Sequence, residues 1–331
     1  MNLDTLLLVG AVVLLVAALS ARLGARAGLP ALLIFLAIGM LLEPFGIRLN
    51  DANLAHELGF AALVFILAEG GFTTRWSEVR GALGLAGLLA TVGVVVSVAA
   101  VAVFAHLVLA LPLPTAVLLG AVTAPTDAAA IFSVLRAVPL PSRMRAILEG
   151  ESGLNDAPIV LLVAVATDWS LGKLTEGGPW VVAGLVIAEL LGGLLLGAVV
   201  GWLGAQLLRR VALPSSGLYP LAAMAVAVLA YGAGVQAHLS GFAAVYVCTV
   251  ILGNSELSHR GATLSFAEGV GTIAQIGLFV MLGMLATPQR LTPAAIATGL
   301  ALGAFVTFVA RPFSVLVCSV WFRVTVKEQM F

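Results

Sequence analysis

Long apolar runs, separated by short segments with charged or turn-forming residues, repeat from one end of the chain to the other. A run of about 18 or more apolar residues is long enough to cross a bilayer as an α-helix. The pattern predicts an all-α, polytopic membrane protein with about eleven transmembrane helices. The predicted spans lie near residues 3–20, 29–43, 56–73, 81–108, 114–136, 143–168, 179–208, 216–238, 240–256, 263–286 and 293–321. The last span contains Pro312, so we expect this helix to be kinked there.

Composition agrees with a membrane location. Hydrophobic residues make up 61% of the 331-residue chain, charged residues make up 10%, and the mean hydropathy is +1.15. A soluble protein of this length cannot cover its surface with so few charges. The net charge is zero, so nothing indicates nucleic acid as a partner. Cys248 and Cys318 both fall in apolar runs, and we expect no disulfide.

The distribution of Lys and Arg predicts the orientation of the helices. If the N-terminus is outside, twelve of the sixteen Lys and Arg residues lie at cytoplasmic ends, three lie outside, and Arg311 lies within the membrane. This asymmetry follows the positive-inside rule. Arg22 and Arg26 come after the first apolar run rather than before it, so we interpret that run as a retained helix and not a signal peptide.

Glycines recur at every fourth position in "GLLLGAVVG", residues 193–201. In membranes this spacing allows two helices to approach closely. We interpret the repeat as packing within the helix bundle rather than as a dedicated dimer interface.

Two carboxylates are predicted near mid-bilayer on neighbouring antiparallel helices. Asp127 lies in "TAPTDAAA", residues 123–130, and Asp156 lies in "ESGLNDAPIV", residues 151–160. Pro125 removes a helix donor and predicts a break in the fifth span, which is tolerated in a membrane only beside a cavity or an ion. The helix pair 114–168 is therefore the predicted core of a site.

The polar residues of the sixth span share one face. At 100° per residue, Glu151, Ser152, Asn155 and Asp156 occupy an arc of about 140°. Together with Thr126 and Asp127 they provide hard oxygen ligands, which suit Na⁺, K⁺ or a proton better than a transition metal. Arg311 is predicted at the depth of Glu151, and an unpaired arginine there would be costly, so we expect an ion pair between them.

Burial determines what such a site can do. Low dielectric favours the neutral form of a carboxylate, so Asp156 could hold either a proton or a cation. Competition for one buried carboxylate couples proton flow to cation flow once access to the site alternates between the two sides. The residues therefore favour an exchange site.

The stretches "TAPTDAAAIFSVLR" and "EGESGLNDAPIVLLV", with "ARP" late in the chain, resemble the monovalent cation/proton antiporter family of the sodium/hydrogen exchanger type, in its NhaP-like Asn-Asp branch. The resemblance implies electroneutral exchange of Na⁺ or K⁺ against H⁺, with Li⁺ as a third candidate cation, and a role in pH homeostasis. It also implies a homodimer in the bacterial inner membrane, and no cofactor. The residue pattern of the first stretch weakly favours the potassium/proton subgroup of this family.

The resemblance also assigns roles by position. It implies that Asp156 carries the ion and the proton beside Asn155. It implies that Asp127, Thr126 and Ser152 are further ligands of the monovalent cation, and that Glu151 with Arg311 is a supporting pair.

Members of the family usually have two more helices than this sequence, so we expect residues 1–331 to form a single antiporter domain that is incomplete at its C-terminus. A cation channel is the nearest alternative, but the sequence has no filter-like loop. An intramembrane hydrolase is less favoured, because neither aspartate lies in a motif for that chemistry. The sequence leaves open the roles of Glu189 and Glu268.

Overall fold

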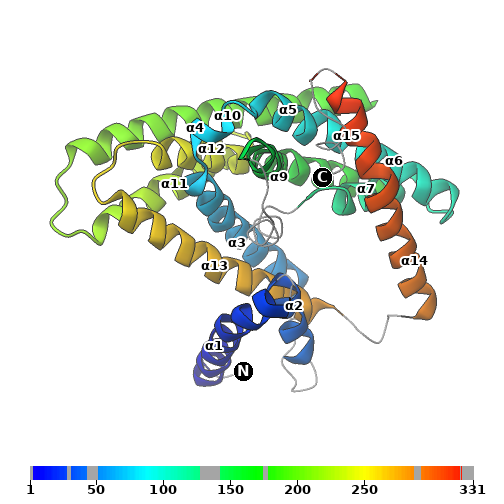
Figure 1. Cartoon of the computed structure of the whole chain (residues 1–331), viewed down its shortest axis with the longest axis horizontal. Helices are drawn as coiled ribbons and strands as arrows, with labels where there is room; N and C mark the ends of the chain where they lie inside the picture. Colours follow the sequence, from blue (N-terminus) through cyan, green and yellow to red (C-terminus); the bar gives the residue numbers. More distant parts are fainter. Residues whose placement is uncertain are drawn as a thin grey trace.

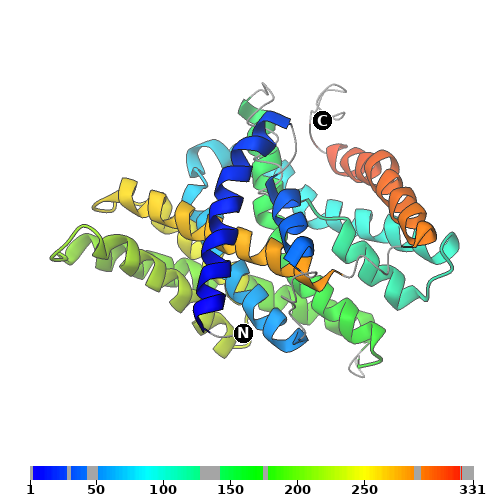
Figure 2. The same ribbon diagram turned by 90° about the horizontal axis from the view of Figure 1, so that it is seen from below.

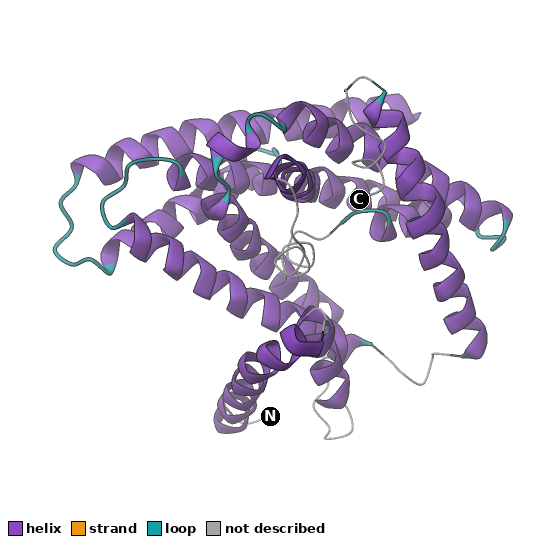
Figure 3. Ribbon diagram, viewed as in Figure 1, coloured by secondary structure: helices purple, strands orange, loops and turns teal. Residues whose placement is uncertain are grey.

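The computed structural model describes residues 3–27, 31–42, 51–126, 142–173, 178–286, 292–320 and 322. Every regular element in this part of the chain is helical (Figure 3). A helix lies in each predicted span, and six of the described helical stretches are long and apolar enough to cross a membrane. The all-α class predicted from the apolar runs is confirmed for these residues.

The helices form two groups with one helix between them (Figures 1 and 2). The first group contains α1 (Leu3–Ala27), α2 (Ala31–Leu42), α3 (Ala52–Thr73), α10 (Gly178–Arg210), α11 (Leu218–Gln236), α12 (Gly241–Gly253) and α13 (Arg260–Leu285). The second contains α5 (Leu83–Leu88), η2 (Leu89–Gly93), α6 (Val94–Leu107), α7 (Leu113–Thr123), α14 (Pro293–Phe305), η4 (Val306–Ala310) and α15 (Arg311–Ser319). Helix α9 (Ser142–Ser170) contacts both groups, and the short α4 (Trp76–Val79) packs against α9.

Some helix ends differ from the prediction. Helix α1 continues to Ala27, well past the predicted end of the first span, and α4 was not predicted. Helix α7 ends at Thr123, whereas the fifth span was predicted to reach residue 136. Most of the remainder of that span falls in residues 127–141, outside the described residues.

The glycine repeat packs inside the first group, as predicted. A Cβ atom added to Gly193, Gly197 or Gly201 on α10 would collide with the backbone of Ser240, Ala244 or Cys248 on α12. The two helix backbones are therefore in direct contact, and only glycine leaves room for this approach. The interpretation of the repeat as packing within the bundle is confirmed.

Replacing Gly197 by leucine is expected to destabilise the α10–α12 contact. The new side chain meets the backbone oxygen of Ala244, which cannot move aside, and overpacking of this kind costs about 1–3 kcal/mol. Thermal unfolding in detergent should show a lower midpoint for Gly197→Leu. Gly184 on the same helix has no atom near its Cβ position, so Gly184→Leu should leave the midpoint unchanged. Equal midpoints for the two variants would contradict the predicted cost.

The second group contains two π-helical turns, one in each of two helices that pack together. The turn η2 contacts α15, and η4 contacts α6. The Sγ atom of Cys318 on α15 lies 3.7 Å from the carbonyl oxygen of Leu88, directly before η2. The π-helical turn η4 ends at Ala310, two residues before Pro312, where a kink was predicted. Because Pro312 cannot donate a helix hydrogen bond, the preceding turn widens by one residue to accommodate its ring.

Candidate functional site

The first part of the predicted site lies where α7 ends. Thr123 is the last residue of this helix, and its hydroxyl donates to the carbonyl of Leu119 at 2.7 Å. Pro125 lacks an amide hydrogen and disfavours continuation of the helix. The half-buried Thr126 is the last described residue before the gap, and Asp127 lies outside the described residues. Helix α7 thus ends two residues before Pro125, where the break in the fifth span was predicted.

The second part lies on α9. Glu151, Ser152 and Asn155 are buried, with 3%, 0% and 0% of their surfaces exposed. Asp156 is the next residue of the same helix, but its side chain lies outside what the structure describes. The helix therefore places three buried polar side chains within two turns, directly before Asp156.

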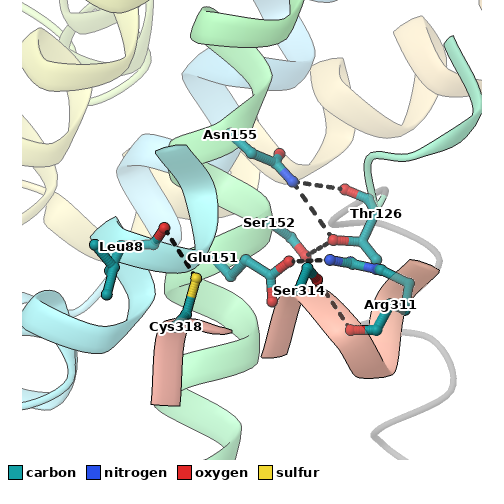
Figure 4. Close-up of polar contacts among 8 residues, drawn as sticks. All are labelled: Leu88, Thr126, Glu151, Ser152, Asn155, Arg311, Ser314 and Cys318. Atoms are coloured by element: carbon teal, nitrogen blue, oxygen red, sulfur yellow. Dashed lines mark hydrogen bonds and ion pairs between the residues drawn. The ribbon is translucent and has the colours of Figure 1, made fainter. Parts of the chain in front are cut away.

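Thr126, Ser152 and Asn155 come together at the end of α7 (Figure 4). The Oγ1 atom of Thr126 lies 3.1 Å from Oγ of Ser152, and either hydroxyl can donate. Nδ2 of Asn155 donates to the carbonyl oxygen and to Oγ1 of Thr126, at 3.4 Å in each case. Oδ1 of Asn155 is buried and has no hydrogen-bond partner among the residues that the structure describes. Turning the amide over would leave Nδ2 without a partner instead, so one polar atom of Asn155 is unsatisfied in either orientation.

An unsatisfied buried polar atom costs about 1–3 kcal/mol, and such atoms commonly bind water or an ion. The neighbouring ligands are hydroxyl and carbonyl oxygens, which are hard donors suited to alkali cations and protons. Within the described part of the chain, no three His, Cys, Asp or Glu side chains lie together as a transition-metal site would require. The arrangement can thus hold a small monovalent cation or a water molecule.

Arg311 joins the site from the second group of helices (Figure 4). Its Nη1 atom lies 2.7 Å from Oε1 of Glu151, and only 4% of the Glu151 side chain and 19% of the Arg311 side chain are exposed. The pair links α9 to α15. Ser314 lies one turn further along α15, and its hydroxyl donates to the Arg311 carbonyl at 2.9 Å. The π-turn η4 ends directly before Arg311, whose amide donates to the Val306 carbonyl.

Sequence reasoning missed two features of the helices, one on α9 and one on α6. Pro158 lies inside α9 and removes the amide hydrogen that the Leu154 carbonyl would accept in a regular helix. Ser97 on α6 is fully buried, and its hydroxyl has no hydrogen-bond partner. Both features could have been found in the sequence, because one is a proline two residues after Asp156 and the other is a single hydroxyl in the apolar run "VVVSVAAVAVF".

Comparison with known proteins decides the family. Residues 10–331 match the family described as sodium/hydrogen exchanger, transmembrane. The chain belongs to this family. It is therefore a multi-pass membrane protein, as the apolar runs predict, and the resemblance recognised from the two polar motifs is confirmed.

The exchanger relatives include several bacterial antiporters. The chain is 34% identical to the K⁺/H⁺ antiporter NhaP of Alkalimonas amylolytica over 332 residues, covering 99% of this chain and 57% of that protein. It is 34% identical to the K⁺/H⁺ antiporter NhaP2 of Shewanella oneidensis, covering 95% and 55%. It is 28% identical to the Na⁺/H⁺ antiporter NhaS2 of a Synechocystis species, covering 80% and 51%. The chain thus spans about half the length of these relatives.

The exchanger fold is also recognised in a solved structure. The sodium proton antiporter MjNhaP1 of Methanocaldococcus jannaschii superposes with a TM-score of 0.84, at 22% identity, over 100% of this chain and 82% of that one. The antiporter-type fold predicted from the sequence is confirmed.

Proposed function

We propose that the chain belongs to the membrane domain of a secondary active transporter, not an enzyme, that exchanges a monovalent cation for a proton without net charge movement. The observation that carries the proposal is the unsatisfied amide atom of Asn155, buried beside Thr126 and Ser152 and directly before Asp156. The family membership and the names of the bacterial relatives support the same activity.

The proposed chemistry is competition for one carboxylate. Asp156 binds the cation or the proton, while Thr126, Ser152 and Asn155, with Asp127, supply further oxygen ligands. A buried carboxylate that binds a cation is neutralised by it, and protonation neutralises it equally, so the site carries the same charge in both loaded states. This equality accounts for an exchange of one cation for one proton. The Glu151–Arg311 pair holds α9 against α15 beside the ligands.

Alternating access requires that the site open to each side of the membrane in turn. Helix α9 carries the proposed ligands and contacts both helix groups, while α7 and α15 belong to the second group. We propose that the second group, with α9, moves against the first and carries the site between the two sides.

The cation is K⁺ or Na⁺ in this proposal, and Li⁺ is a third candidate. Relatives named for K⁺ and for Na⁺ both occur, and oxygen ligands serve either ion. We further propose residues 1–331 as one transmembrane domain with helix pair 114–168 as its core. We also propose an N-terminus outside the bacterial inner membrane and assembly as a homodimer within the lipid bilayer.

Exchange should be measurable with the full-length gene product in proteoliposomes. The expected result is that external Na⁺, K⁺ or Li⁺ drives proton efflux from acid-loaded vesicles, recorded with an internal pH dye. The rate should not change when ionophores clamp the membrane potential, because no net charge moves. Protein-free liposomes treated in the same way provide the control, and the cation that gives the fastest efflux identifies the substrate.

The same assay separates the alternatives. A cation channel would carry a current that follows the clamped potential, and an intramembrane hydrolase would move neither ion. Correctly folded protein that gives no cation-dependent proton movement with any of the three ions would refute the proposed function.

A further inference from the structure

A cavity of about 560 Å³ lies between the two helix groups, and none of the proposed cation ligands is among its lining residues. The first group contributes Leu194 of α10 and Val250 of α12 to its lining. Leu83 of α5 and Leu154 of α9 line it from the other side. Cavities of this size hold small molecules or parts of larger ones. Most of the lining surface is apolar, which favours an apolar occupant.

Polar groups at the edge of the cavity are already engaged with the protein. Asn254 accepts a hydrogen bond from the Trp76 amide at 2.9 Å and donates to the Thr74 carbonyl at 2.8 Å. The Thr74 hydroxyl donates to the Gly70 carbonyl at 2.6 Å and lies 3.4 Å from the Tyr246 hydroxyl. These groups tie α3, α4 and α12 together. Because they are satisfied within the protein, they favour an occupant that needs no hydrogen bond.

Three arginines flank segments that line this end of the cavity. Arg75 stands between Thr74 and Trp76 in the chain, and both Arg75 and Arg80, which flank α4, are exposed. The exposed Arg260 donates from Nε to the Gly253 carbonyl at 2.9 Å, next to Asn254. Glu256 is the exposed acidic residue in the same loop. The distribution of Lys and Arg predicts that this end is cytoplasmic, the side on which basic pockets between helices bind anionic lipid headgroups.

Trp76 marks the boundary between the apolar cavity and the basic surface. Its side chain lines the cavity and is 50% exposed. Tryptophan is enriched at the level of lipid headgroups, where one part of the ring is apolar and another part is polar. The arginines, the tryptophan and the apolar cavity thus follow the order of headgroup, interface and acyl chain in a phospholipid.

We propose that this cavity binds one acyl chain of an anionic phospholipid, with the headgroup against Arg75, Arg80 and Arg260. The bound chain contacts both helix groups and therefore connects them. The proposal concerns lipid binding alone, and its test does not depend on cation exchange.

Fluorescence quenching of Trp76 by brominated lipid tests the proposal in the full-length protein. Trp169, Trp180, Trp202 and Trp321 are replaced by phenylalanine, so that Trp76 is the reporter within residues 1–331. Any tryptophan beyond these residues is replaced as well. The protein is reconstituted in phosphatidylcholine with rising fractions of phosphatidylglycerol brominated in its acyl chains. Trp76 should be quenched several-fold more than expected from the bulk lipid fraction, and quenching should saturate at low fractions.

A second reporter gives the bulk comparison. Trp202 lies on the same side of the membrane by the predicted topology, and 58% of its surface is exposed on α10. A protein that keeps only Trp202 should be quenched in proportion to the lipid fraction. Brominated phosphatidylcholine should quench Trp76 several-fold less than brominated phosphatidylglycerol does at the same fraction.

Matched variants locate the binding. Leu194→Phe fills the cavity and should reduce the quenching of Trp76 several-fold, whereas Leu195→Phe, at a neighbouring position that is 70% exposed, should not. Arg75→Gln with Arg80→Gln should remove the preference for the anionic lipid. If quenching of Trp76 follows the bulk fraction as that of Trp202 does, or is equal for the two headgroups, the proposal is wrong. Both of these results come from an unmodified cavity, so they stand even if Leu194→Phe does not fold.

Discussion

Asp156→Asn is expected to reduce cation-driven proton exchange to the level of protein-free liposomes. Asparagine has nearly the same shape as aspartate but can carry neither the charge that a cation neutralises nor the proton that is exchanged for it. Asp156 is the carboxylate next to Asn155 on α9, and the replacement removes the group for which we propose that both ions compete. Proton efflux with K⁺ and with Na⁺ measures the effect.

Asp168→Asn is the matched control. Asp168 is an exposed residue near the other end of the same helix, and its replacement should leave the exchange rate unchanged. If exchange persists in Asp156→Asn at the rate of this control, Asp156 does not carry the ions. Asp127 would then be the carboxylate to test in the same way.

Glu151→Leu is expected to lower the free energy of unfolding by about 3–5 kcal/mol, because it leaves the Arg311 guanidinium charged and without its carboxylate in the membrane interior. The Oε1–Nη1 distance of 2.7 Å and the burial of both side chains indicate a strong pair in low dielectric. Unfolding in detergent, followed by thermal scanning or by steric trapping, measures the loss.

The double variant Glu151→Leu/Arg311→Met distinguishes the effect of the unpaired charge on stability from the effect of changed side-chain packing. Replacing both partners of a buried ion pair by apolar side chains is often close to neutral, so most of the lost stability should return. Glu268→Leu changes an exposed glutamate on α13 and should have little effect. A single variant as stable as the wild type would show that the pair contributes nothing. If the double variant is as unstable as Glu151→Leu, the loss of stability comes from the changed side-chain shape at position 151 and not from the unpaired charge of Arg311.

Much of the architecture could be predicted because membrane helices are selected by apolar length alone. Each predicted span contains a helix, and the glycine repeat on α10 packs against α12 as expected. The helix ends were less predictable. Helix α1 continues past Ser20 to Ala27, since polar residues at a membrane surface can extend a helix that the hydrocarbon core no longer requires.

The candidate site was predictable in its residues and in one contact, the ion pair of Glu151 with Arg311, but not in its other contacts. Helical periodicity places Glu151, Ser152 and Asn155 on one face of α9, and matching depth suggests Arg311 as a partner of Glu151. Periodicity has no information on distances between helices. The meeting of Thr126 with Ser152, the unsatisfied amide of Asn155 and the π-turn before Arg311 all depend on how α7, α9 and α15 pack.

The sequence by itself determined the fold class, the family and the polar residues of the site, because these follow from apolar length, spacing and local motifs. Only the tertiary structure decided which polar atoms are satisfied and where a cavity remains. Leu83, Leu154, Leu194 and Val250 come from four different helices, and nothing in their spacing along the chain indicates that they line one cavity. Whether buried atoms touch or leave a cavity depends on how helices that are distant in the sequence pack against one another.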